Sequence, residues 1–173
     1  RSTLFPYTTL FRSSEIRLSE EWRTKSEELI CFVYIMKNIV IAAGYATRLG
    51  ELTKNFPKPL LKIGENTILG RMLDDIDKIS EIDEHIIITN HKFAGIFEEW
   101  ASKQSYTKPV TIVDDGTETN DTRLGAVCDL LFAMDKLKID DDMLVVAADN
   151  ILFFSFQEFV DFAKAIFKKC KSH

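Results

Sequence analysis

A glycine-containing loop in the first third of the chain holds the residues best suited to chemistry on a phosphate. Residues 42–49 read Ala-Ala-Gly-Tyr-Ala-Thr-Arg-Leu, and residues 57–60 read Pro-Lys-Pro-Leu. Small side chains let the backbone approach a ligand, and the main-chain N–H groups of such a loop suit phosphate oxygens. Arg48 adds a planar fork of donors and Lys58 adds a point charge. Two cations beside a polyphosphate would neutralise the charge that develops on a leaving group.

Other well-known phosphate loops do not fit this stretch. A Walker A loop needs Gly-x4-Gly-Lys followed by Ser or Thr, and the chain has no such string. A dinucleotide-binding loop needs Gly-x-Gly-x-x-Gly, but Ala46 and Thr47 interrupt that pattern. Pro57 and Pro59 flank Lys58 and restrict the backbone, so we expect a stiff segment to present the lysine.

Strands and helices are expected to alternate about four times after residue 36, and together they must position this loop. Short apolar runs predict strands over residues 38–43, 85–89, 110–113 and 143–148. Apolar residues at helical spacing predict helices over residues 67–79, 93–103, 124–137 and 155–167. Ser155 and Glu158 have the spacing of a capping box at the start of the last helix. Apolar strands without polar alternation indicate a mostly parallel, Rossmann-like α/β sheet with helices on both faces, which binds ligands at the carboxyl ends of its strands.

Asp149 follows the strand predicted over residues 143–148, and we regard it as the candidate metal ligand. Mg²⁺ is commonly held by one or two carboxylates together with substrate phosphates and water. Asp149 could equally be a turn or capping residue at a strand end. The other acidic clusters, Asp114 with Asp115 and residues 140–142, are expected to be turns and solvated surface.

The residues of the loop resemble the signature of the sugar-phosphate nucleotidyltransferases, of the glucose-1-phosphate thymidylyltransferase type. That signature is a strand, then Ala-Ala-Gly-x-Gly/Ala-Thr-Arg-Leu, then Leu-Thr, then Pro-Lys-x-Leu, and each part occurs in order within residues 42–61. The resemblance extends from residue 36 to about residue 167. It implies transfer of a nucleoside monophosphate from a nucleoside triphosphate to a sugar 1-phosphate, with release of pyrophosphate.

The resemblance also implies roles for individual residues. Arg48 would hold the leaving pyrophosphate, Lys58 would contact phosphate at the reacting centre, and Asp149 would bind the catalytic Mg²⁺. Gly125 matches the glycine of a turn that meets the nucleobase. The residues expected at the nucleotide are Ala43, Gly44, Tyr45, Ala46, Thr47 and Gly125. Two positions depart from the pattern: Glu51 replaces a common proline, and Ala148 replaces a glycine, which would add a methyl group near the phosphates.

Composition narrows the class of protein. Hydrophobic residues make up 46% of the 173 residues, and the net charge is −5, which argues against a nucleic-acid binder. No apolar run approaches the roughly 18 residues needed to cross a bilayer, so no membrane contact is expected. Three cysteines without CxxC spacing favour reduced thiols in the cytoplasm. A homo-oligomeric state is compatible with the sequence.

The two ends of the chain carry separate expectations. Residues 3–13 resemble a translated sequencing adapter, so residues 1–35 are interpreted as a non-native leader without a role in folding, and a native N-terminal helix is the alternative. Residues 36–173 are interpreted as the nucleotide-binding half of a longer domain that is truncated on its C-terminal side. We therefore expect weak nucleotide binding and little or no turnover. A cytidylyltransferase for phosphocholine-like alcohol phosphates, a non-catalytic nucleotide-binding module and a fragment that does not fold stably remain alternatives.

Overall fold

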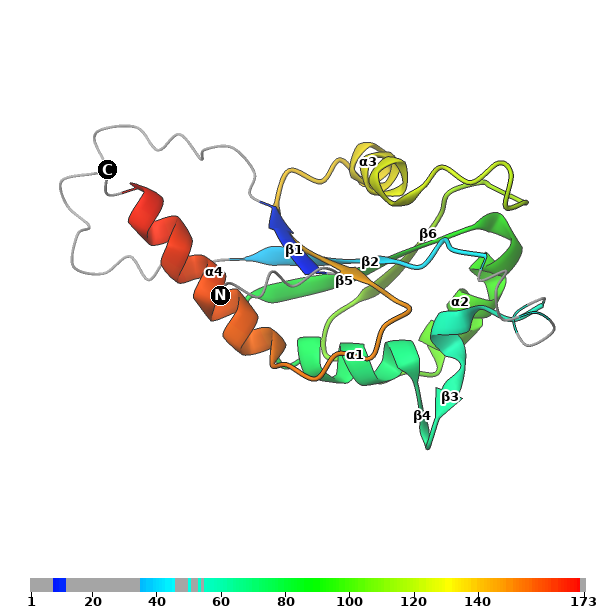
Figure 1. The fold of residues 1–173 in the computed structure, drawn as a ribbon, viewed down its shortest axis with the longest axis horizontal. Coiled ribbons are helices and arrows are strands. Elements are labelled where there is room, and N and C mark those ends of the chain that lie inside the picture. Colours follow the sequence, from blue (N-terminus) through cyan, green and yellow to red (C-terminus); the bar gives the residue numbers. More distant parts are fainter. Residues whose placement is uncertain (1–7, 12–34, 46–49, 51–52, 54, 172–173) are drawn as a thin grey trace.

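A five-stranded sheet forms the centre of the computed structural model, which describes residues 8–11, 35–45, 50, 53 and 55–171 (Figure 1). Its strands lie in the order β1-β7-β2-β5-β6. They are β1 (Thr8–Phe11), β2 (Met36–Ile41), β5 (Ile82–Thr89), β6 (Val110–Asp114) and β7 (Asp142–Ala147). The last four run parallel, and β1 alone is antiparallel to its neighbour.

The chain order of the parallel strands determines where ligands can bind. From β2 the chain adds β5 and then β6 on one side, and it then returns to place β7 on the other side of β2. Ile41 at the end of β2 therefore pairs with Ile88 of β5 on one side and with Ala147 of β7 on the other. Connections leave in opposite directions from such a switch point, and a crevice opens there beyond the carboxyl ends of the strands.

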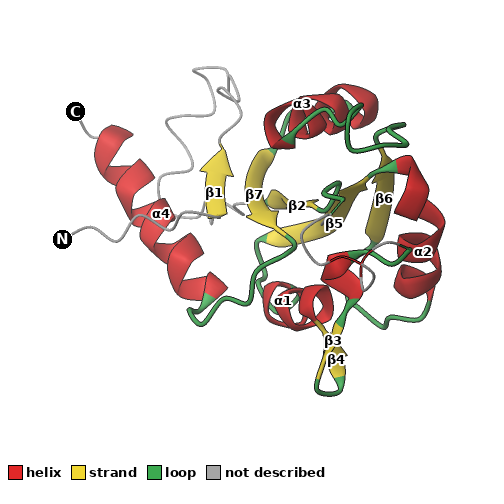
Figure 2. Ribbon diagram, turned by 45° about the vertical axis from the view of Figure 1, so that its right-hand side comes forward, coloured by secondary structure: helices red, strands yellow, loops and turns green. Residues whose placement is uncertain are grey.

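Helices cover both faces of the sheet (Figure 2), as the sequence predicts. On one face lie α1 (Ile68–Ile76), α2 (His91–Ser102) and α4 (Phe156–Lys171). On the other lies α3 (Ala126–Leu137). The core on the first face includes Met36, Val40, Leu69, Leu73, Ile76, Ile87, Phe93, Phe97, Leu144, Val146, Phe156 and Val160. The core beneath α3 includes Ile39, Ile86, Ile88, Val113, Leu130, Ala133 and Met143. Consecutive strand residues alternate between the two, because successive side chains point to opposite faces.

Every strand and helix predicted after residue 36 is present, with ends that differ by a few residues. The strand predicted over residues 38–43 is β2, which ends at Ile41 because Ala42 and Ala43 already belong to the loop. Three short elements after residue 36 were not predicted: the 3-10 helix η3 (Lys58–Leu60) and the two-stranded hairpin of β3 (Lys62–Ile63) and β4 (Asn66–Thr67). At α4 the Ser155 hydroxyl accepts a hydrogen bond from the backbone N–H of Glu158 at 3.3 Å, which is one of the two hydrogen bonds of the predicted capping box.

Strand β1 corrects the expectation that residues 3–13 have no part in the fold. Thr8–Phe11 pairs antiparallel with β7, with Thr8 opposite Val146 and Phe11 opposite Met143. A strand at the edge of a sheet presents a row of unpaired N–H and C=O groups, and these pair with any extended backbone. Side-chain periodicity therefore could not reveal this strand.

The start of α1 is a tightly packed cap. The Thr67 hydroxyl accepts a hydrogen bond from the backbone N–H of Gly70 at 2.9 Å, and Asn66 donates to Asp74 at 2.6 Å. A Cβ atom added at Gly70 would lie 2.2 Å from Asn66 Oδ1 and 2.8 Å from Thr67 Oγ1. Glycine is therefore required here by close approach of the capping side chains, although it lowers helix propensity.

Gly70→Ala is expected to destabilise the protein by roughly 1–2 kcal/mol, because the capping side chains must move and the hydrogen bond of the cap weakens. Gly95→Ala in α2 is the matched control, since a Cβ atom there meets nothing within 4 Å. That change should stabilise the protein by roughly 0.5–1 kcal/mol through helix propensity. Urea unfolding of both variants measures the difference, and stabilisation by both would show that the cap does not constrain Gly70.

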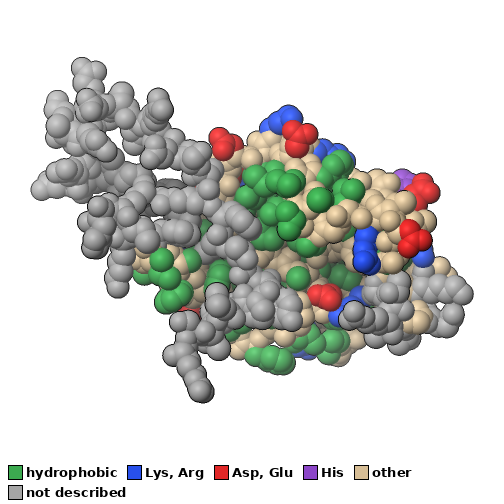
Figure 3. Space-filling model, turned by 45° about the horizontal axis from the view of Figure 1, so that its top comes forward, with side chains coloured by type: hydrophobic (Ala, Val, Ile, Leu, Met, Phe, Trp, Pro, Cys, Tyr) green, Lys and Arg blue, Asp and Glu red, His purple; other side chains and the backbone are tan. Residues whose placement is uncertain are grey.

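One side of α3 is exposed. Figure 3 turns the face that carries α3 forward and shows apolar side chains gathered at its surface. The exposed apolar residues of α3 are Val127 (72% exposed), Leu131 and Leu137, and Leu124 precedes them. The described residues thus cover only the sheet-facing side of this helix. None of the described helices is both long enough and apolar enough to cross a membrane.

Candidate functional site

The switch point brings together two residues that are far apart in sequence. Lys58 lies in the segment that follows β2, and Asp149 follows β7. Their side chains form an ion pair, with Lys58 Nζ 3.1 Å from Asp149 Oδ2. The structure therefore places the predicted phosphate-binding lysine and the predicted metal ligand at one point of the carboxyl edge.

A rigid turn presents Lys58, as the flanking prolines predict. Pro57 precedes η3 with φ −72° and ψ 134°, and Pro59 and Leu60 are buried. The backbone N–H of Leu61 donates to the Lys58 carbonyl at 3.0 Å, which closes the turn. The turn is thus anchored in the core while the lysine side chain reaches Asp149 with 31% of its surface exposed.

The Asp149 carboxylate has a protein partner on each oxygen but stays open to solvent. Asn150 donates to Asp149 Oδ1 at 2.8 Å, Lys58 contacts the other oxygen, and 54% of the Asp149 side chain is exposed. Among the described residues, no group of three or more His, Cys, Asp or Glu side chains could hold a metal ion. Mg²⁺ takes most of its ligands from phosphates and water, so one exposed carboxylate suffices for a candidate site, although Lys58 pairs with that carboxylate in this structure.

Ala148 is the position where the sequence analysis expects an added methyl group near the phosphates. The residue is fully buried and belongs to the core on the face of α1, α2 and α4. Its backbone N–H donates to the Ile41 carbonyl at 3.0 Å, which continues the β2–β7 ladder. The alanine therefore contributes to packing, and it gives no local reason to expect a non-catalytic protein.

The first residues of the glycine loop are held against the end of the sheet. Ala42 and Ala43 are buried, and Gly44 is exposed with nothing within 4 Å of a Cβ atom added to it. The Asn90 side chain donates to the Ala43 carbonyl at 3.0 Å and accepts from the backbone N–H of Phe93 at 3.1 Å. Asn90 thus caps α2 and fixes the loop at the same time. Three predicted residues, Ala46, Thr47 and Arg48, lie outside the described residues.

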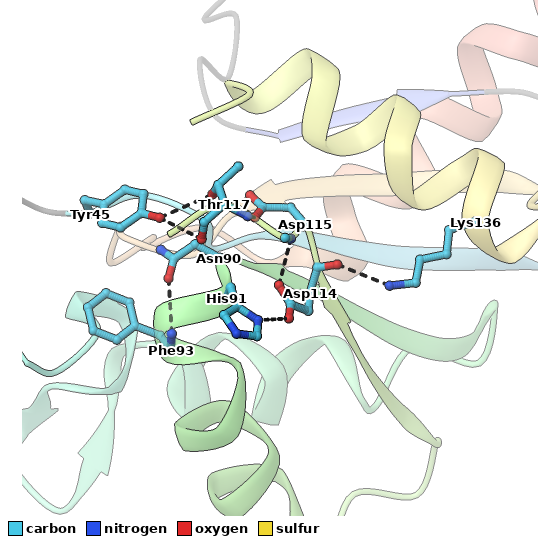
Figure 4. Close-up of polar contacts among 9 residues, drawn as sticks. Tyr45, Asn90, His91, Phe93, Asp114, Asp115, Thr117 and Lys136 are labelled. Atoms are coloured by element: carbon cyan, nitrogen blue, oxygen red, sulfur yellow. Dashed lines mark hydrogen bonds and ion pairs between the residues drawn. The ribbon is translucent and has the colours of Figure 1, made fainter. Parts of the chain in front are cut away.

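Tyr45 continues the loop toward the segment that follows β6. Its hydroxyl donates to the Thr117 carbonyl at 2.9 Å and lies 3.3 Å from Thr117 Oγ1 (Figure 4). Burial raises the pKa of Tyr45, and the nearby Asp115 carboxylate adds to that rise. The backbone N–H of His91 also donates to the Thr117 carbonyl, at 2.9 Å. Sequence reasoning missed Thr117, since a threonine in a turn carries no signal of this contact.

A second set of polar contacts ties α2 and α3 to the end of β6. His91 Nδ1 lies 2.6 Å from Asp114 Oδ2, and Lys136 donates to the Asp114 carbonyl at 3.2 Å (Figure 4). The hydrogen bond to Asp114 raises the pKa of His91. Asp114 therefore favours the protonated form of His91, next to the loop that holds Tyr45.

The sequence analysis expects Asp115 to lie at the solvated surface, and this expectation is wrong. Asp115 is buried, with 7% of its surface exposed. Its Oδ1 atom accepts from the backbone N–H of Thr117 at 2.7 Å, so the side chain forms the turn. Asp114 fits the expected role of a turn residue, because it accepts from the Gly116 N–H at 2.8 Å. An acidic pair in a turn does not reveal which of its members points inward.

Gly125 begins α3 with φ +87°, a conformation that strongly favours glycine. Its carbonyl accepts from the backbone N–H of Asp129, which starts the helix. The backbone conformation at the start of α3 therefore explains why a glycine occupies position 125, and its role at a nucleobase stays a prediction.

An open hollow of about 410 Å³ lies at the opposite end of β6. Residues such as Glu98, Tyr106 and Lys108 line it, and none of the predicted site residues does.

Comparison with known proteins gives one family. A family model described as nucleotidyl transferase matches residues 37–172. The chain is 28% identical over 123 residues to a 2-C-methyl-D-erythritol 4-phosphate cytidylyltransferase of Bifidobacterium longum, which covers 71% of this chain and 40% of that protein. It is 29% identical over 130 residues to a mannose-1-phosphate guanyltransferase of Debaryomyces hansenii, which covers 75% of this chain and 34% of that protein.

A solved structure shares the fold. A Bacillus anthracis protein described as a glucose-1-phosphate thymidylyltransferase superimposes with a TM-score of 0.64 at 22% identity, over 75% of this chain and 50% of that chain. The chain thus spans between a third and a half of the length of these proteins. The family match over residues 37–172 includes the glycine loop, η3 and the end of β7, which carry the candidate site.

Proposed function

This chain belongs to the nucleotidyl transferase family, and on that premise we propose that it is the nucleotide-binding part of an enzyme that transfers a nucleoside monophosphate to a sugar 1-phosphate. The observation that carries the proposal is the Lys58–Asp149 contact at the switch point, beside the glycine loop. A cation and an exposed carboxylate at that edge are suited to a triphosphate and its metal ion. The relatives of the chain include a mannose-1-phosphate guanyltransferase, whose name specifies a sugar 1-phosphate.

The reaction would need alignment and charge neutralisation more than a protein nucleophile. A phosphate oxygen of the acceptor would bond to the α-phosphorus of the triphosphate, while the bond between the α-phosphorus and the bridging oxygen breaks and pyrophosphate leaves. Lys58 would neutralise charge on the reacting phosphates, and Arg48 would hold the departing pyrophosphate. Gly44 and its neighbours would offer backbone N–H groups to the phosphate oxygens.

Asp149 is the residue that would hold Mg²⁺, with Asn150 orienting its carboxylate. A bound Mg²⁺ would supply charge neutralisation at the α-phosphate. In the structure the Lys58 ammonium group pairs with the Asp149 carboxylate. Lys58 would therefore leave Asp149 and turn to a phosphate oxygen when nucleotide and metal bind.

We also propose that the protein is located in the cytoplasm. The free thiol of Cys128 fits that reducing compartment.

Thermal unfolding of the chain with Mg²⁺ and each of dTTP, UTP, CTP, GTP and ATP tests the proposal. Stabilisation by one triphosphate is expected, because a ligand that binds only the folded state raises the melting temperature. Arg48→Ala should remove that stabilisation, whereas Arg71→Ala, at an exposed position of α1, should keep it. If none of the five nucleotides shifts a clean unfolding transition, this chain does not form the proposed site.

The same set of five nucleotides also tests a second candidate function. A cytidylyltransferase for an alcohol phosphate is favoured by the similarity to the 2-C-methyl-D-erythritol 4-phosphate cytidylyltransferase. Stabilisation by CTP alone would support that candidate over a sugar 1-phosphate transferase that uses dTTP, UTP or GTP.

A further inference from the structure

Two buried carboxyl groups interact near the turn that contacts Tyr45 of the glycine loop. Asp115 follows β6 and Asp129 lies in the first turn of α3, with 7% and 3% of their surfaces exposed. Asp115 acts on Asp129 through its charge and through a side-chain hydrogen bond, so the two carboxyl groups are neighbours. Asp115 Oδ2 and Asp129 Oδ1 are nevertheless buried atoms without a hydrogen-bond partner. Two ionised carboxylates in this arrangement would repel each other and leave both oxygens unsatisfied.

A single proton shared by the two carboxyl groups would remove the charge repulsion and give both unpaired oxygens a hydrogen bond. Asp115 is the better acceptor, because its other oxygen already accepts from the Thr117 N–H at 2.7 Å. Asp129 is then the member that carries the proton. Burial raises the pKa of Asp129 to about 6, and the charge of Asp115 adds to that rise.

The pair is linked to the glycine loop by successive contacts. Asp115 holds the Thr117 N–H, and Thr117 accepts the Tyr45 hydroxyl through its carbonyl oxygen. Figure 4 shows Thr117 between Tyr45 and Asp115. The same carbonyl accepts the His91 N–H at the start of α2. Hydrogen bonds to Thr117 therefore connect Asp115 with Tyr45, the residue next to Gly44.

We propose that Asp115 and Asp129 share one proton, and that this bond fixes the Thr117 turn and Tyr45, so that protonation of the pair tightens nucleotide binding. Asp129 is then a positioning residue, which acts through Asp115 and Thr117 without touching the ligand. The inference rests on the proposed function for its effect on nucleotide, whereas the shared proton itself does not depend on a ligand.

The other charged groups around the pair define the controls. On the side of the glycine loop lies Tyr45, near Asp114 and Glu118. Asp114 is paired with His91 and contacts Lys136 through its carbonyl. On the side of the sheet, the core beneath α3 is apolar, with Ile39, Ile86, Ile88 and Val113. His91 is thus the nearby group whose titration must be separated from that of Asp129.

Asp129→Asn tests the shared proton without ligand. The amide donates a hydrogen bond to Asp115 at every pH and so imitates the protonated pair. The wild-type pair favours folding fully below the unfolded pKa of 3.8, and this contribution is lost as the pH rises through about 6. At pH 8 the variant should melt about 3 °C or more above the wild type, whereas near pH 4 the two should melt together. Parallel melting profiles, or a variant that melts lower at both pH values, would overturn the proposal.

Two further variants exclude other sources of pH dependence. Asp135→Asn changes an exposed carboxylate of the same helix and should keep the wild-type profile. In a His91→Gln background, Asp129→Asn should produce the same difference at pH 8, because the proton belongs to Asp129. A wild-type protein that Mg²⁺ or Ca²⁺ stabilises at pH 8, through Asp129, would show a shared cation in place of the proton and overturn the proposal.

The effect on the nucleotide loop is measured separately. The backbone amide signals of Thr117 and Tyr45 in NMR spectra should titrate near pH 6 in the wild type and much less in Asp129→Asn. With a stabilising triphosphate and Mg²⁺, the wild-type shift in melting temperature should fall from pH 5.5 to pH 8 relative to that of the variant. If no triphosphate stabilises either protein, the proposed function fails, while the ligand-free profiles still decide the shared proton. Equal triphosphate shifts at both pH values would overturn the link to the loop.

Discussion

Asp149→Asn is expected to weaken the binding of a divalent cation by about 100-fold or more, because it removes the carboxylate that we propose as the metal ligand. Even outer-shell partners of a metal ligand contribute about 10–100-fold. Mn²⁺ binding followed by electron paramagnetic resonance, with the stabilising triphosphate present, measures the effect. The part of the nucleotide stabilisation that requires Mg²⁺ should disappear in the same variant. Asp135→Asn, which removes an equal charge from an exposed ion pair with Lys138, should leave both measurements unchanged.

Lys58→Met should separate the two roles of the lysine at this site. The ion pair with Asp149 competes with a metal ion, so without nucleotide the variant is expected to bind Mn²⁺ more tightly than the wild type. With nucleotide present, the loss of a cation at the phosphates should weaken binding of the triphosphate. Lys62→Met, at an exposed position of β3, is the control and should change neither property. Weaker Mn²⁺ binding in both states would show that Lys58 does not compete for Asp149.

Asp77→Ala is expected to lower the free energy of unfolding by roughly 2–4 kcal/mol, because it leaves the buried His85 imidazole without its acceptor and removes the hydrogen bonds from the Thr107 and Lys108 N–H groups. Asp77 ends α1, and its carboxylate lies 3.1 Å from His85 Nε2. It also accepts from the Thr107 N–H at 2.9 Å and from the Lys108 N–H at 3.2 Å. His85 is fully buried, and Asn38 Nδ2 donates to its Nδ1 atom at 2.9 Å. The neutral imidazole therefore carries its proton on Nε2 and donates it to Asp77.

The acid profile of the same network follows from the two pKa shifts. Burial acts to raise the pKa of Asp77, but its hydrogen bonds to Thr107, His85 and Lys108 outweigh that effect and lower it to about 2. Its stabilising contribution is complete above the unfolded value of 3.8 and is lost as the pH falls through about 2. Burial lowers the pKa of His85, so its contribution is complete above 6.5 and is lost as the pH falls below that value.

Urea unfolding between pH 2 and pH 8 checks both statements. The wild type should lose stability first below pH 6.5 and again toward pH 2, and Asp77→Ala should lack the second loss. Asp83→Ala removes a surface carboxylate that pairs with Lys37 at 3.0 Å and should cost less than about 1 kcal/mol. Equal losses in the two variants would show that the Asp77 network is no stronger than a surface ion pair.

The sequence by itself determined the class of fold and the segment that carries the chemistry. Apolar runs such as residues 85–89 and helical spacing such as that of residues 67–79 predicted the parallel sheet and its helices, because burial of apolar residues follows the period of each element. The spacing of Pro57, Lys58 and Pro59 predicted a stiff turn, since proline restricts the backbone locally. These properties depend on neighbouring residues, and so the sequence contains them directly.

Only the tertiary structure decided which distant residues meet. The Lys58–Asp149 contact depends on the return of β7 to the far side of β2, and residues 91 positions apart in sequence carry no local sign of it. The inward direction of Asp115, its approach to Asp129 and the contact of Tyr45 with Thr117 depend likewise on how β6, α3 and the glycine loop pack. Strand β1 pairs through backbone atoms alone, which every residue except proline possesses in full, and the buried position of Ala148 follows from the register of β7 against β2.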